Sequence, residues 1–136
     1  MTTQKVLLIT GASKGIGAAT ALRAARDGWS VAVHYLSDAT GAQSVCDGIV
    51  ANGGQAHAFQ ADLQIDAQIE ALFKNVLNHF GQLNGLVNNV GITPLFGRVD
   101  EMNATRLNEV FNTNITSAFL CAGHAVRAMS TRYGHS

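Results

Sequence analysis

A glycine-rich stretch near the start of the chain, Thr10-Gly11-Ala12-Ser13-Lys14-Gly15-Ile16-Gly17, has the composition of a phosphate-binding loop. Gly11 permits a tight turn, Gly15 leaves room for the close approach of a ligand, and Gly17 lets a following helix pack closely. A helix that begins here would present unpaired N–H groups and a partial positive charge to a pyrophosphate. The chemistry indicated is the binding of a dinucleotide.

Because glycines also gather in ordinary turns, the elements on either side of this stretch decide its interpretation. Residues 6–9 are an apolar run typical of a buried strand. The Ala-rich residues from about Gly15 to Asp27 predict a helix, which Gly28 is placed to cap. The order strand, glycine turn, helix favours the phosphate-binding interpretation.

The rest of the chain alternates between strand and helix patterns. The predicted strands after the first are residues 30–35, 55–61 and 85–89, and the predicted helices are residues 39–51, 65–80 and 103–132. This alternation predicts right-handed βαβ units in a Rossmann-type, doubly wound parallel sheet of three α/β/α layers. The expected strand order is third, second, first, fourth, with ligands bound at the carboxyl ends. Since no fifth strand follows, residues 1–136 are expected to be the front part of a single domain, truncated after the fourth strand and its helix.

The last predicted helix runs from about Asn103 to Arg132, with Asn103 or Thr105 as its N-cap. It is marked by an apolar stripe of Leu107, Val110, Phe111, Ile115, Ala118, Phe119 and Ala122. Asn114 lies beside this stripe, which is expected to face the sheet. An asparagine at such a position is unfavourable and must find hydrogen-bond partners if it is buried.

Composition excludes several other classes of protein. The formal net charge of zero gives no basic field for nucleic acid or an anionic membrane, and no apolar run reaches transmembrane length. Cys46 and Cys121 lie in helical patterns and are expected to be small buried thiols, which fits a reducing cytoplasm. The five histidines show no pair at metal-ligand spacing, so no metal site is predicted.

The spacing Gly-x-x-x-Gly-x-Gly preceded by Thr resembles that of the short-chain dehydrogenase/reductase family. Three further places match the family in the right order: Asp62-Leu63, Asn88-Asn89-Val90-Gly91 and Asn114. The second of these resembles the family's Asn-Asn-Ala-Gly signature, with Val90 a mild departure. The match extends from Val6 to Arg127, and its general look is close to that of 3-oxoacyl-carrier-protein reductases and glucose dehydrogenase-like members.

The resemblance implies an oxidoreductase that transfers a hydride between a nicotinamide cofactor and a small carbonyl or secondary alcohol substrate. It also implies a homo-oligomer, a dimer or tetramer, in which the last helix takes part in an interface. Asn114 matches the asparagine of the family's catalytic tetrad, where a helix break holds a water. Asn88 is expected to steady the central strands. The cofactor-binding residues implied are Gly11, Ser13, Lys14, Gly15, Ile16, Gly17, Tyr35, Ser37, Asp62, Leu63, Asn89, Val90 and Gly91.

The choice between NADP and NAD depends on the end of the second strand. A carboxylate there accepts the ribose 2′-hydroxyl of NAD and repels the 2′-phosphate of NADP. The family's position is Tyr35, which is not acidic, while Lys14 and Ser37 can both contact a phosphate. NADP is therefore favoured. Asp38, where the generic spacing would place an acid, keeps NAD as the alternative.

The family's catalytic Ser, Tyr and Lys are absent from the 136 residues. Tyr133 follows Asn114 too closely to replace the tyrosine, which acts as a general acid toward the carbonyl. The alternative to an enzyme is accordingly a non-catalytic nucleotide-binding or assembly fragment. Residues 94–98 either form one wall of a substrate pocket or cover the sheet, and the substrate itself is not indicated.

Overall fold

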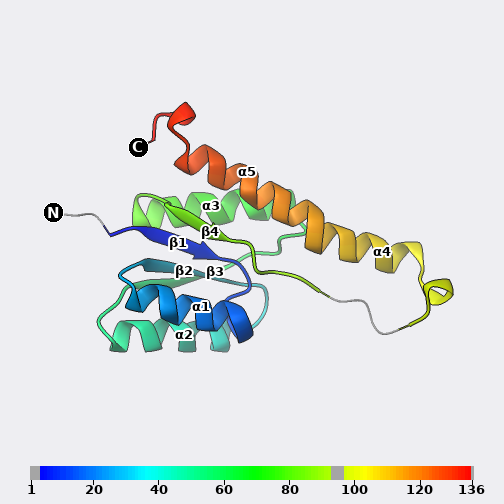
Figure 1. Cartoon of the computed structure of the whole chain (residues 1–136), viewed down its shortest axis with the longest axis horizontal. Coiled ribbons are helices and arrows are strands. Elements are labelled where there is room, and N and C mark those ends of the chain that lie inside the picture. The colour runs from blue at the N-terminus through cyan, green and yellow to red at the C-terminus, as the bar shows by residue number, and fades with distance from the viewer. Residues whose placement is uncertain (1–3, 93–96, 136) are drawn as a thin grey trace.

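The computed structural model describes residues 4–92 and 97–135. Its centre is one sheet of four parallel strands in the order β3-β2-β1-β4 (Figure 1). The strands are β1 (Val6–Ile9), β2 (Ser30–Tyr35), β3 (Ala56–Gln60) and β4 (Gly85–Val87). Both the parallel pairing and the predicted strand order are confirmed.

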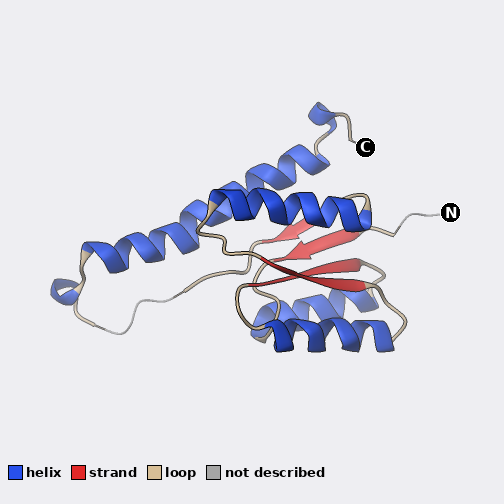
Figure 2. Cartoon of the chain, turned by 180° about the vertical axis from the view of Figure 1, so that it is seen from behind, coloured by secondary structure: helices blue, strands red, loops and turns tan. Residues whose placement is uncertain are grey.

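Helices cover both faces of this sheet (Figure 2). One face is covered by α1 (Gly15–Arg26) and α2 (Ala39–Ala51), and the other by α3 (Asp66–Phe80) and α5 (Ser117–Met129). The predicted three-layer α/β/α architecture is confirmed.

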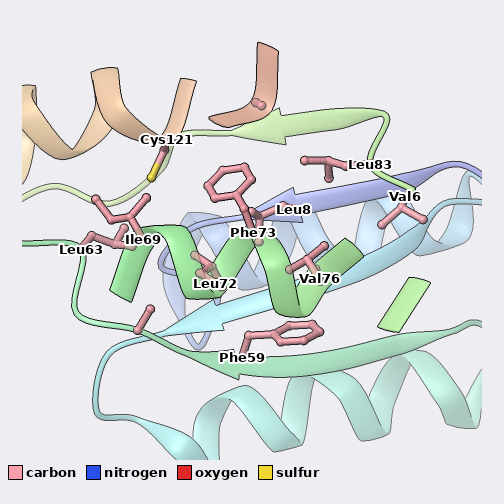
Figure 3. Close-up of a cluster of buried hydrophobic side chains, with 13 residues drawn as sticks. Val6, Leu8, Phe59, Leu63, Ile69, Leu72, Phe73, Val76, Leu83 and Cys121 are labelled. Atoms are coloured by element: carbon pink, nitrogen blue, oxygen red, sulfur yellow. The ribbon is translucent and has the colours of Figure 1, made fainter. Parts of the chain in front are cut away.

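Because both faces are covered, successive residues of a strand enter different cores. In β1, Leu8 packs into the cluster under α3 and α5, whereas Ile9 packs into the cluster under α1 and α2. Such strands are nearly continuous apolar runs rather than alternating ones. Figure 3 shows the first cluster, in which Leu72, Phe73 and Val76 of α3 fill the space between the helix and the sheet.

Side chains and glycines near the helix ends fix where the helices begin and end. The carboxylate of Asp38 accepts a hydrogen bond from Gly41 N at 3.0 Å and caps α2. The predicted choice between Asn103 and Thr105 is resolved in favour of Asn103, whose Oδ1 accepts from Arg106 N at 2.9 Å. Gly81 ends α3 in the left-handed conformation, with φ 83°.

The prediction of a helix over residues 103–132 is correct for residues 104–129 and wrong at its C-terminal end. The helix consists of α4 (Ala104–Phe111), a π-helical turn (Asn112–Thr116) and α5, and the π turn lies where the family resemblance implies a helix break at Asn114. Short 3-10 helices form at Val99–Glu101 and Thr131–Tyr133. The residues that flank the π turn keep α-helical dihedral angles. Neither propensity nor periodicity therefore reveals the interruption.

The predicted orientation of this helix is also wrong, since its apolar stripe does not pack on the sheet. Phe111, Ile115 and Phe119 are 54%, 46% and 77% exposed. Figure 1 shows α4 extending beyond the carboxyl ends of the strands, away from the sheet. The buried face carries small side chains instead, namely Thr113, Ser117, Cys121 and Ala125. These let α5 approach β4 so closely that Asn88 Nδ2 donates to Ala118 O at 3.1 Å.

Both cysteines are buried free thiols, and burial raises the pKa of each to about 11. Within residues 4–92 and 97–135, no helix combines the length and the hydropathy needed to cross a bilayer. The cytoplasmic location stays a prediction.

Candidate cofactor-binding site

The turn between β1 and α1 has the geometry that the glycine spacing predicts. Gly11 and Gly15 both have positive φ angles, of 62° and 61°, which favour glycine. A Cβ at Gly15 would meet no atom within 4 Å, so that face of the turn is open. A Cβ at Gly17 would lie 2.3 Å from Gly11 O and 2.9 Å from Ala12 Cα. The glycine thus lets the helix pack against the turn itself.

The N-terminus of α1 is left without a side-chain cap. Its N-cap residue is Lys14, whose side chain makes no capping hydrogen bond, and its first turn holds no acidic residue. By contrast, α2 and α4 are capped by Asp38 and Asn103. Helix α3 also lacks a side-chain cap, but its first turn carries the acidic Asp66. The N–H groups of the first helical turn need acceptors, and an anionic group supplies them. The open turn and the uncapped helix therefore fit the phosphates of a dinucleotide.

A pocket of about 350 Å³ opens beside this turn at the carboxyl ends of the strands. The predicted cofactor residues that line it are Gly11, Ser13, Lys14, Tyr35, Ser37, Asp62, Leu63, Asn89, Val90 and Gly91. Among the predicted residues that do not line it, Ile16 is 78% exposed and Gly17 is packed against the turn. The structure brings most of the predicted set together, while their binding of a cofactor stays a prediction.

A larger hollow of about 1000 Å³ lies at the opposite, amino edge of the sheet, beside Trp29 and Ser30. We place the site in the smaller pocket for two reasons. The carboxyl edge of a parallel sheet is where the loops and helix N-termini converge on a ligand. The uncapped helix α1 also begins at that edge.

Residues just after β1 and β4 hold the glycine turn from one side. Thr10 Oγ1 accepts hydrogen bonds from Asn89 N at 2.9 Å and from Val90 N at 3.1 Å. Asn89 Nδ2 donates to Gly11 O at 3.0 Å. The predicted role of Asn88 in steadying the central strands therefore falls to Asn89. Adjacent residues of an extended chain point to opposite sides, so Asn88 reaches α5 instead.

His34 holds the turn from the other side and was not predicted from the sequence. The imidazole is 1% exposed, and it accepts from Gly11 N at Nδ1 and contacts Ala61 O with Nε2, both at 2.9 Å. Burial lowers the pKa of His34 below its ordinary value, although the hydrogen bond to Ala61 opposes this. A histidine within a run of strand-forming residues is a signal of a buried polar group that needs partners.

The two carboxylates of the pocket both make local hydrogen bonds. Asp62 Oδ1 accepts from Gln64 N at 3.0 Å, which is the turn-forming alternative to a role in binding adenine. Asp38 also lines the pocket, yet one of its oxygens is committed to capping α2. Tyr35 and Lys14 line the same pocket. The end of β2 itself therefore carries no carboxylate that would repel a 2′-phosphate.

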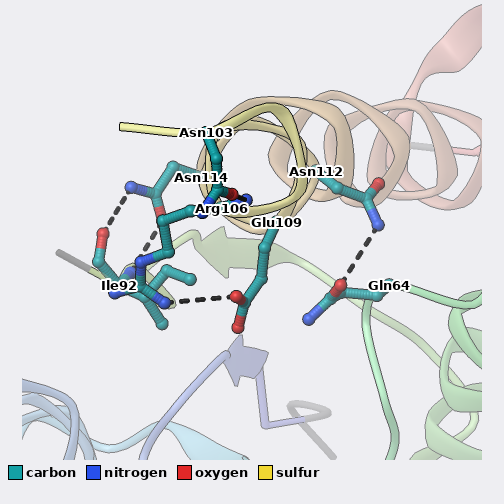
Figure 4. A network of polar contacts seen from close by, with 7 residues as sticks. All are labelled: Gln64, Ile92, Asn103, Arg106, Glu109, Asn112 and Asn114. Carbon is teal, nitrogen blue, oxygen red and sulfur yellow. Dashed lines mark hydrogen bonds and ion pairs between the residues drawn. The ribbon is translucent and has the colours of Figure 1, made fainter. Parts of the chain in front are cut away.

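Asn114 lies in the π-helical turn and is bonded to one residue of the loop that follows β4. Its Oδ1 accepts from Ile92 N and its Nδ2 donates to Ile92 O, each at 2.7 Å (Figure 4). Both polar atoms of the amide therefore have partners, as the sequence predicts for a buried asparagine. In the same view, Asn112 Nδ2 donates to Gln64 Oε1 at 3.4 Å, which connects this turn to the pocket rim.

Two further expectations from the sequence concern a metal site and one wall of a substrate pocket. The described residues include no cluster of three or more His, Cys, Asp or Glu side chains that could hold a metal. Residues 93–96, which include most of the predicted wall of a substrate pocket, lie outside the described part of the chain.

Comparison with known proteins identifies the family. The profile described as short chain dehydrogenase matches residues 5–135, and the chain therefore belongs to that family. It is 41% identical over 131 residues to the uncharacterized oxidoreductase YgfF of Escherichia coli, covering 96% of this chain and 53% of that protein. It is also 41% identical over 123 residues to the 3-oxoacyl-[acyl-carrier-protein] reductase of a Synechocystis species, covering 88% of this chain and 48% of that protein.

Solved structures agree with this assignment. A short-chain dehydrogenase from Burkholderia cenocepacia, solved in complex with NADP, superposes with a TM-score of 0.87 at 38% identity. The superposition covers 93% of this chain and 52% of that one. The chain thus spans about half the length of the relatives it matches.

Proposed function

We propose that the full-length protein is an NADP-dependent oxidoreductase acting on a small carbonyl or secondary alcohol substrate. Residues 1–136 form the dinucleotide-binding front part of its domain. The observation that carries this proposal is the uncapped N-terminus of α1, which opens beside Lys14 onto a pocket with no carboxylate at Tyr35. The cofactor supplies or accepts the hydride when bound, and the residues of this chain hold and orient it.

The preference for NADP over NAD follows from the charges around the pocket. Lys14 attracts a 2′-phosphate and Ser37 offers it a hydroxyl group. Asp38 is the only argument for NAD, and its cap to Gly41 gives it a structural role that needs no cofactor. The NADP-bound Burkholderia structure supports the same choice, since it shares this fold.

Titration of both cofactors by calorimetry on the full-length protein tests this preference. NADP is expected to bind more tightly than NAD, and Lys14→Ala is expected to weaken NADP about fivefold while leaving NAD little changed. Lys74→Ala, on the exposed side of α3, serves as the matched control. Equal affinities for the two cofactors would contradict the assignment. So would a preference for NAD that disappears in Asp38→Asn, which removes the charge and keeps a capping oxygen.

The alternative of a non-catalytic nucleotide-binding fragment is favoured by one feature of the sequence. Proton transfer to a developing alkoxide needs a positioned acid, and the 136 residues include none of the family's catalytic Ser, Tyr and Lys. The 136-residue chain expressed alone is accordingly expected to bind NADP without hydride transfer on any ketone or alcohol. The measurement is absorbance at 340 nm with a substrate panel. Turnover that survives removal of contaminating reductases would show that the missing residues are not required.

A homo-oligomer, dimer or tetramer, remains part of the proposal. The exposed apolar side chains of Phe111, Ile115 and Phe119 on α4, the π turn and α5 support it.

A further inference from the structure

The tautomer of His34 is fixed by the backbone around it. Gly11 N–H can only donate, so Nδ1 of His34, at 2.9 Å, must be an unprotonated acceptor. Ala61 O can only accept, so Nε2 must carry the proton that it donates over 2.9 Å. The neutral Nε2–H imidazole therefore satisfies both groups, and no other protonation state does.

The same residue holds two successive N–H groups of the glycine turn. The carbonyl oxygen of His34 accepts from Ala12 N at 2.8 Å, next to the bond from Gly11 N to its ring. Gly11 and Ala61 lie on the rim of the pocket, and the imidazole spans the distance between them. The ring thus sets the separation of two walls, the glycine turn and the carboxyl end of β3.

We propose that His34 is a positioning residue of the cofactor site, which keeps these two walls apart by the width that the adenosine half of a dinucleotide needs, and that its protonation weakens cofactor binding. The inference rests on the proposed function because it concerns the same site. In the imidazolium form both ring nitrogens are donors, so an Nδ1–H would face the N–H of Gly11. The bond that holds the turn would be lost, and the two donors would repel each other.

The direction of the pH dependence follows from the surroundings of the ring. Burial lowers the pKa of His34 below its ordinary value of 6.5. The other titratable side chains that line the pocket are Lys14, Tyr35, Asp38 and Asp62, and the described structure shows no hydrogen bond or ion pair from any of them to the ring. The imidazole is thus neutral above pH 6.5, where binding is unaffected. Affinity is expected to fall only as the pH drops below that value.

The test is calorimetric titration of NADP and of NAD into the full-length protein between pH 5 and pH 8. Affinity of the parent for both cofactors is expected to stay constant from pH 8 to pH 6.5 and to fall toward pH 5, by at most about tenfold per pH unit because one proton is involved. Both cofactors are needed because a 2′-phosphate itself titrates near pH 6, at about the second pKa of a phosphate monoester. An effect present with NADP alone would belong to that phosphate and would overturn the inference.

Two variants separate positioning from general stability. His34→Asn retains an oxygen that can accept from Gly11 N but is too short to reach Ala61 O. It is therefore expected to bind both cofactors at pH 7 more weakly than the parent and more tightly than His34→Leu, with a flat pH profile. His34→Leu is expected to bind about tenfold more weakly at pH 7. His79→Asn on α3 is the matched control and is expected to keep the parent's profile.

The outcomes distinguish this inference from the proposed function. A His34→Asn protein whose pH profile equals that of the parent would overturn the inference. If circular dichroism shows that His34→Leu does not fold, the pH profile of cofactor affinity in His34→Asn still tests the inference on its own. A folded parent that binds neither NADP nor NAD at any pH would instead overturn the proposed function, and the inference with it.

Discussion

Gly17→Ala is expected to weaken NADP binding by about a hundredfold, although the change adds only one methyl group. The added Cβ would lie 2.3 Å from Gly11 O and 2.7 Å from Asn89 Nδ2. Neither neighbour can yield cheaply, because Gly11 is held through its N–H by His34 and through its oxygen by Asn89. Overpacking of this kind costs about 1–3 kcal/mol or more, and each 1.4 kcal/mol is a factor of about ten in affinity.

The measurement is calorimetric titration of NADP into the full-length variant, together with its melting temperature. Gly48→Ala is the matched control, since it makes the same change in α2, where the nearest atom to the new Cβ is Leu22 Cδ2 at 3.6 Å. Alanine is a better helix former than glycine, so this control is expected to bind normally and to melt no lower than the parent. A Gly17→Ala protein with unchanged affinity would show that the turn can open without loss of the site.

Asn114→Ala is expected to lower the turnover number of the full-length enzyme at least tenfold while NADP binding is retained. The variant leaves the N–H and the carbonyl of Ile92 without their partners, at a cost of about 1–3 kcal/mol. Most domains tolerate such a loss without unfolding. The loop after β4 would no longer be fixed to the π turn. A displacement of about 1 Å near a reacting group can cost about a hundredfold in rate.

Steady-state kinetics and thermal melting decide between a catalytic and a packing role. A catalytic role of Asn114 lowers kcat much more than it changes the cofactor's Kd, whereas a packing role lowers the melting temperature and leaves kcat near the parent's value. Asn78→Ala, an exposed asparagine of α3, is the control for the loss of an amide from a helix. Full turnover in Asn114→Ala would show that Asn114 has no catalytic role in this enzyme, although it matches the asparagine of the family's tetrad.

The sequence predicts the layers and the strand order well because they follow from local pattern. Strands such as β2, with the run Val31-Ala32-Val33, show their two-sided burial directly as continuous apolar residues. The orientation of α5 could not be predicted in this way. An apolar stripe on a helix predicts that this face is buried, but it does not identify the element that covers the face. The face that approaches β4 is instead the one with small side chains, Ser117 and Cys121 among them.

The glycines that shape the site can be predicted from the sequence, whereas most of the hydrogen bonds that hold the site cannot. The positive φ of Gly11 and Gly15 follows from residue type and spacing. The role of Asp38 as an N-cap has a clear signal in the sequence, because an acidic residue stands immediately before a predicted helix. His34 has no motif at all, because its partners, Gly11 and Ala61, come together only when three strands align.

The π-helical turn also determines which of its own residues face the loop that follows β4. Each residue of an α-helix advances the chain by about 100° around its axis, and a π turn accommodates one residue more than an α turn does. Deleting a single residue from Asn112–Thr116 would therefore leave a regular α-helix in which α4 and α5 keep nearly the same relative phase, because the wide turn is where the extra residue is accommodated. The residues of the turn itself would move, and Asn114, which now faces the backbone of Ile92, is one of them. A relative with one residue fewer in this turn must use a different side chain to hold that loop, however similar the flanking residues are.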